Sequence, residues 1–254
     1  MKQHALILTL LIAGALFTNA AAQGMAATPP PSAAPLGKVT AAAVWQPSQD
    51  VLSKAKSFCD KSMGAASFPE CFMNQLAAAG APAEAVAFTR AVYQQNDGQV
   101  GILNAFKSYG TVGIAQIMYP LRANDNYGLL FVNSDPNLLD PDDLKKLDQA
   151  AMNQDPLFLS IKKQYPQTDV WPGDRSSADP WPRTQSLPNG GTEFIVNYLL
   201  INGCHACQRT GIARFGWDFD ASGKFLKTVF IPTPPPPKIL KRPHGTPPGA
   251  PPQQ

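Results

Sequence analysis

The spacing of apolar residues changes along the chain and predicts helices first and strands later. Between residues 48 and 106, apolar residues recur every three or four positions, which is typical of amphipathic helices. Ser48 is suited to cap the first helix, and Pro82 suits the first position of a later one. We expect four helices here, over residues 48–58, 71–79, 82–93 and 100–106.

From Val112 onward the pattern favours strands, because apolar residues form short runs or alternate with polar ones. In the clearest case, Phe215 and Trp217 point to one face, while Arg214 and Asp218 point to the other. One run is apolar on both faces, so we expect it to be a central strand. The five expected strands are 112–119, 127–133, 193–202 (the central one), 212–219 and 224–231.

Between the two groups of strands, we expect two helices and a long loop. Asp140-Pro141 and Asp155-Pro156 each place a capping aspartate before a proline, which is typical of helix starts. Residues 166–191 contain two Trp-Pro steps and predict a loop. The fold class is therefore α+β. We expect a helical N-terminal half packed on an antiparallel sheet of about five strands, flanked by disordered Pro-rich ends.

The two ends of the chain differ in composition from its middle. Residues 1–22 have a basic start, a short apolar core and small residues before a cleavage site, which predicts a signal peptide. Residues 23–47 form an Ala/Pro-rich linker and residues 232–254 a Pro-rich tail, and we expect both to be disordered. A single domain is left at 48–231. We expect a bacterial protein that is periplasmic or secreted.

Charge and hydropathy limit the kinds of partner. The chain has 21 basic and 18 acidic residues, and three of the basic ones lie in the tail. The domain is thus close to neutral, which argues against a nucleic-acid groove. After signal cleavage, we expect no membrane span. An envelope protein or a glycan is the partner that we expect.

The four cysteines predict disulfides in an oxidising compartment. A Cys59–Cys71 bridge would join the first two helices and contribute about 3 kcal/mol by loop closure, against about 2 kcal/mol for Cys204–Cys207. For the second pair, four roles are open: a structural clamp, a recognition tip that presents His205, a redox-active dithiol, and a metal site. Arg209 can favour a thiolate. However, a strand is expected after Cys207, where a thioredoxin-like site has a helix.

Other candidate chemistry is sparse. The sequence contains no G-x-S-x-G or H-E-x-x-H motif, no P-loop and no dinucleotide fingerprint, and we expect no cofactor and no metal. Trp171 and Trp181 either fix their loop on the sheet or form an aromatic platform for a glycan or peptide. The candidate binding residues are therefore His205, Arg209, Trp171 and Trp181.

An exported α+β protein with a disulfide-closed loop that carries His205 resembles the periplasmic inhibitors of vertebrate-type lysozyme. The resemblance covers this loop and the expected topology. In that family a loop histidine enters the lysozyme active site. Because the Cys204–Cys207 turn is small, rigid if oxidised and flanked by Arg209, we expect a non-enzymatic binding or inhibitor protein that presents this Cys-x-x-Cys loop. The alternative is a periplasmic thiol-disulfide oxidoreductase that uses Cys204 and Cys207.

Overall fold

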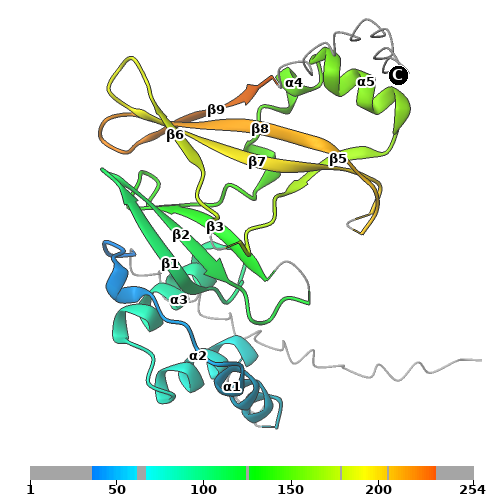
Figure 1. Cartoon of the computed structure of the whole chain (residues 1–254). Coiled ribbons are helices and arrows are strands. Elements are labelled where there is room, and N and C mark those ends of the chain that lie inside the picture. The colour runs from blue at the N-terminus through cyan, green and yellow to red at the C-terminus, as the bar shows by residue number, and fades with distance from the viewer. Residues whose placement is uncertain (1–35, 62–66, 124–125, 178, 205, 233–254) are drawn as a thin grey trace, which may run out of the picture. The chain divides into compact units, whose positions relative to one another are not determined.

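The computed structural model describes residues 36–61, 67–123, 126–177, 179–204 and 206–232 (Figure 1). Over these residues the chain is α+β, as the apolar pattern predicts. The helices are η1 (Ala41–Ala43), α1 (Gln49–Lys61), α2 (Phe68–Ala78), α3 (Ala83–Gln95), η2 (Leu144–Lys146), α4 (Gln149–Met152) and α5 (Pro156–Gln164). The strands are β1 (Ile102–Tyr109), β2 (Val112–Met118), β3 (Tyr127–Val132), β4 (Leu138–Leu139), β5 (Thr168–Pro172), β6 (Arg183–Ser186), β7 (Thr192–Asn202), β8 (Arg209–Phe219) and β9 (Phe225–Ile231).

The strands form two sheets, so the expectation of one sheet of about five strands was wrong. The first sheet has the order β1-β2-β3-β4, and the second has β5-β7-β8-β9 with β6 also paired to β7 (Figure 1). Strand β7 pairs with β5 and β6 on one side and with β8 on the other, which confirms it as a central strand. A second sheet forms because β2, buried at every position, needs a cover on both of its faces.

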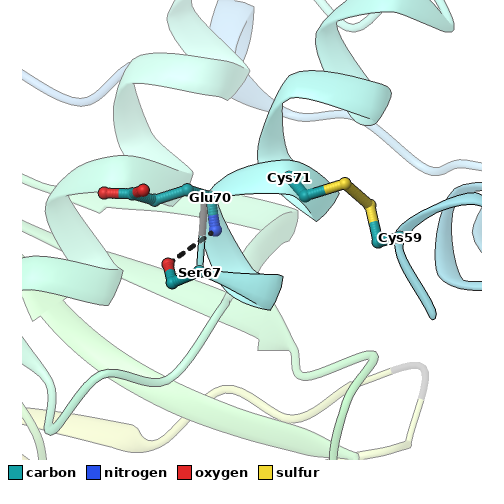
Figure 2. The surroundings of a disulfide bond; sticks show 4 residues. All are labelled: Cys59, Ser67, Glu70 and Cys71. Carbon is teal, nitrogen blue, oxygen red and sulfur yellow. Dashed lines mark hydrogen bonds between the residues drawn. A yellow bond between two sulfur atoms is a disulfide. The ribbon is translucent and has the colours of Figure 1, made fainter. Parts of the chain in front are cut away.

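Helices cover one face of the first sheet. Phe88 and Val92 of α3 pack with Ile117 of β2 in one buried cluster. Helices α1 and α2 contribute to a neighbouring cluster and are joined by the expected Cys59–Cys71 disulfide, with 5.8 Å between the two Cα atoms (Figure 2). The Ser67 hydroxyl caps α2 by accepting a hydrogen bond from the Glu70 amide at 3.4 Å (Figure 2). The first three predicted helices are thus present.

The second sheet covers the other face of the first sheet. Phe131 of β3 lies among three aromatic rings of the second sheet, with centroid distances of 5.2 Å to Phe194, 5.6 Å to Trp217 and 5.0 Å to Phe219. Residues of η2, α4 and α5 complete the same core. We call this buried face of the second sheet its inner face. The outer face carries the residues that alternate with these, such as Leu199 and Ile212.

Three predicted elements differ in the structure. Residues 100–106, expected as a helix, contribute instead to strand β1. Asp140 does not open a helix, because its carboxylate accepts the Asp142 amide at 2.7 Å in a turn, and the following residues form the short helices η2 and α4. The expected loop 166–191 contains strands β5 and β6. Both pair with β7, although their sequences lack the apolar runs of a buried strand.

The two ends of the chain are only partly described. The expected signal peptide, residues 23–35 of the linker and residues 233–254 of the tail lie outside the described residues. Residues 36–47, which we assigned to the linker, pack on the first sheet, where Val39 and Ala43 are buried with α3. Among the described helices, none combines the length and the apolar character needed to cross a membrane.

Candidate functional site

The Cys204–Cys207 disulfide lies at the turn between β7 and β8, and we call residues 203–208 the tip. The two Cα atoms are 5.0 Å apart, and the Cys207 amide donates to the Cys204 carbonyl at 2.7 Å. Gly203 opens the turn with a φ of +93°, a conformation that favours glycine. Both cysteines are exposed. His205, the candidate contact residue between them, lies outside the described residues.

Hydrogen bonds to the segment before β5 hold the tip in place. The Gly203 amide donates to the Gln167 carbonyl at 3.0 Å, and the Gln167 amide donates to the Asn202 side chain at 3.1 Å. Strand β8 begins at Arg209, directly after the tip. Among the described residues around the tip, no helix begins at either cysteine, so these residues supply no helix dipole of the kind that activates thioredoxin-like thiols.

The structure brings only some of the candidate residues together. Arg209 is exposed and lines a hollow of about 530 Å³ together with Cys207. Trp171 belongs to β5, opposite Leu199, and is half-buried. Trp181 is half-buried and packs partly against the inner core. Neither tryptophan lines the hollow beside the tip.

A loop of residues 173–182, which we call the bridging loop, runs from β5 to β6 beside the edge of β7. It borders the tip hollow and a larger hollow of about 810 Å³, which lies over the outer face of β7 and β8. The two hollows share Gly173, Asp174, Arg175 and Leu199 in their linings. A side chain at position 173 would clash, because a Cβ there would lie 2.7 Å from the Asn197 carbonyl oxygen. The glycine thus lets the loop pass directly beside β7.

Arg175 fixes the bridging loop to both sheets. Its side chain is buried, with one guanidinium nitrogen 3.0 Å from Asp142 and the other donating to the Asn197 carbonyl at 3.2 Å. Its own carbonyl accepts a hydrogen bond from Gln116 of β2 at 2.6 Å. The Arg175 Nε is also buried, and no described residue accepts its hydrogen. The loop therefore holds a guanidinium group beside both hollows, and its buried Nε–H has no partner among the described residues.

Further charged groups surround the hollows. Arg183 and Arg214 line the larger hollow and Arg209 the tip hollow, and within the described chain none of them forms an ion pair. Two carboxyl groups are also present, from Asp174 and Asp179. The Ser176 hydroxyl, 2.6 Å from the Asp174 carboxylate, and the Ser176 amide hold the pKa of Asp174 below its usual range.

Another pocket, of about 640 Å³, contains a carboxyl group that can exchange a proton near neutral pH. Burial, together with the neighbouring charge of Asp142, raises the pKa of Asp140 to about 7. Burial also raises the pKa of Tyr119, whose hydroxyl accepts a hydrogen bond from Asn96 at 3.0 Å. Among the described residues, no cluster of three or more His, Cys, Asp or Glu is placed to hold a metal ion.

Local sequence pattern carries a partial signal for these residues. The alternation in 212–219 correctly separates Arg214 from the inward-facing Phe215. Asp218 also lies on the outer face, and yet it is buried there at 6% exposure. No local pattern points to Arg175, which meets Asp142 from 33 positions away. Comparisons of the chain with family models, curated proteins and solved structures find no match.

Proposed function

We propose that this chain is an exported, non-enzymatic binding or inhibitor protein of the cell envelope, and that the tip is its contact site. The observation that carries this proposal is the position of the tip: an exposed, disulfide-closed turn that directly borders a hollow, with Cys207 and Arg209 in the lining of that hollow. A short turn that is closed by a disulfide loses little conformational entropy on binding.

Two features support export and an envelope location. The described chain contains two disulfides and no free cysteine, as is usual in oxidising compartments. The composition of residues 1–22 is that of a signal peptide. His205 and Arg209, on either side of Cys207, offer a ring and a cation to a partner.

A pull-down from envelope extract, followed by reconstitution with the purified partner, tests the proposal. We expect the partner to be retained by the wild type and lost by His205→Ala, Arg209→Ala and the double variant Cys204→Ser/Cys207→Ser. Lys163→Ala, on the exposed end of α5, is the matched control and should retain the partner. A partner that binds all four variants as well as the wild type would refute a role for the tip.

The exposure of both cysteines favours one second candidate, a thiol-disulfide oxidoreductase. Its reduction potential separates the two functions. A structural clamp should lie below about −300 mV and resist glutathione, whereas a catalytic pair should lie well above that value. The single variant Cys207→Ser should trap no mixed disulfide if the binding function is correct, and a trapped partner would favour the redox function.

A further inference from the structure

We propose that the larger hollow binds an acidic segment of the protein partner, with carboxylate side chains on the arginines and an apolar side chain on the floor. This inference rests on the proposed binding function and names the chemistry of the partner. It concerns a surface separate from the tip, since Cys204 and Cys207 do not line this hollow.

The donors in the wall of the hollow are arranged for an anionic, acceptor-rich group. Arg175 is buried at 7% exposure, and its Nε–H has no partner among the described residues. Arg183 is exposed and Arg214 half-buried, and neither forms an ion pair within the described part of the chain. Arg214 uses one nitrogen to donate to the Pro232 carbonyl at 3.1 Å, which leaves its other donors for a ligand. Guanidinium groups bind carboxylates through paired hydrogen bonds.

The carboxyl groups in the wall do not cancel this preference. Asp174 keeps its negative charge, because the Ser176 amide at 2.9 Å and the Ser176 hydroxyl at 2.6 Å donate to its carboxylate. Asp142 neutralises the charge of Arg175, whose Nε–H has no partner among the described residues. The lining holds three arginines against two carboxylates, those of Asp174 and Asp179. Among the described residues, neither carboxylate forms an ion pair with Arg183 or Arg214. The lining thus offers more cationic donors than it can pair itself.

The floor of the hollow favours a peptide over a glycan. Its aliphatic side chains come from the outer face of β7 and β8, and Ile212 is 51% exposed, with Leu199 opposite it and Ile195 nearby. The hydroxyl-rich rings of a glycan would bury little apolar surface on this aliphatic floor. Trp181 also lines the hollow, and part of its ring packs against the inner core. A peptide with leucine-like side chains flanked by glutamates would place the aliphatic side chains on the floor and the carboxylates on the arginines of the wall.

Fluorescence anisotropy with the full chain tests the inference. The probe is a short labelled peptide of alternating Glu and Leu, compared with Gln/Leu and Lys/Leu peptides and with a uronate oligosaccharide. We expect only the Glu/Leu peptide to bind. The double variant Arg183→Glu/Arg214→Glu should weaken its binding at least about ten-fold. Added salt should weaken binding as well, because the charges at the rim are exposed to solvent.

The matched control is Lys56→Glu/Lys163→Glu, which makes the same change in net charge on exposed residues of α1 and α5 and should leave binding unchanged. Equal binding of all the peptides, preference for the uronate, or equal weakening by both double variants would overturn the inference. The tip is tested separately. If the partner depends on the tip and still binds Arg183→Glu/Arg214→Glu, this inference fails and the proposed function stands. If binding of the Glu/Leu peptide requires Arg183 and Arg214 while the tip variants still bind the partner, the contact role of the tip fails and this inference stands.

Discussion

At the residue scale, Asp140 and Asp220 show how the surroundings of a carboxyl group change its effect on folding. Burial raises the pKa of Asp140 to about 7. Asp220 is exposed at the turn before β9, where hydrogen bonds from the Ser222 hydroxyl and from backbone amides lower its pKa. Ionisation of Asp140 thus costs stability in the folded protein, whereas ionisation of Asp220 contributes stability.

We expect Asp140→Asn to remove much of the loss of stability between about pH 5 and about pH 8. The unfolded carboxyl has a pKa near 3.9, so between about pH 4 and pH 7 the folded protein binds more protons than the unfolded chain. Its free energy of unfolding therefore falls as the pH rises through this window. The gain in stability of the variant over the wild type should therefore be larger near pH 8 than near pH 5, as measured by urea unfolding.

Asp220→Asn is the control, because its carboxylate is fully ionised at both of these pH values. It should lower stability by the same amount at both. If Asp140→Asn keeps the full decline of the wild type, then a group other than Asp140 causes the decline.

At the element scale, strand β1 explains why one predicted helix was wrong. A β-bulge between Leu103 and Ala105 inserts Asn104 into the strand, so Leu103 and Phe106 share the face that packs toward α3. Apolar residues three positions apart then imitate the helical period. The expected loop 166–191 was wrong because of strand pairing: β5 and β6 lie beside β7 through backbone hydrogen bonds, which leave little trace in side-chain pattern.

Elements that depend on local signals were predicted well. The hairpin β2–β3, the turn with Gly223 at a φ of +88° and helix α5 with its Asp155 cap are all present. These features depend on residues close in sequence, such as a proline after a capping aspartate. The tip is also of this kind, since two apolar runs flank its cysteines.

The two disulfides should differ in their contribution to stability. Replacing Cys59 and Cys71 together by Ala should lower the free energy of unfolding by about 3 kcal/mol, because the loop that they close is longer. The corresponding change at Cys204 and Cys207 should cost about 2 kcal/mol or less. Urea unfolding of the two double variants checks this order, and a larger loss for the tip would contradict it.

At the scale of the whole molecule, residues far apart in sequence connect the sheets and could not be predicted from local pattern. Arg175 joins the bridging loop to Asp142, 33 positions away, and Gln116 of the first sheet donates to the Arg175 carbonyl, 59 positions away. These contacts hold the bridging loop, which borders both hollows. Nothing in the sequence indicates that these residues contact one another, because only the packing of the two sheets brings them together.

The Arg175–Asp142 ion pair should show strong coupling. Arg175→Met alone should cost about 3–5 kcal/mol, because it leaves the Asp142 carboxylate without its cation in a largely buried position. The double variant Arg175→Met/Asp142→Asn should cost less than the sum of the two single changes, with a coupling of about 0.5–3 kcal/mol. Additive losses in urea unfolding would show that the pair does not hold the loop.

The segment before α1 is part of the folded core, although its composition predicts a linker. Asn133, at the end of β3, accepts the Val39 amide at 2.7 Å and donates to the Val39 carbonyl at 2.8 Å. Val39 is 4% exposed and packs in the same cluster as α3. The packed part of the described chain thus extends into the segment that we assigned to the linker.

A chain that begins at Leu36 should therefore be more stable than one that begins at Ser48. The difference should be about 3 kcal/mol, from burial of Val39 and its two hydrogen bonds to Asn133. Asn133→Gly is the informative second change, because glycine tolerates the positive φ of 58° at this position. It should destabilise the chain that begins at Leu36 and have little effect on the one that begins at Ser48, which lacks Val39. Equal urea midpoints for the two chains, or equal effects of Asn133→Gly in both, would show that Val39 contributes nothing to the fold.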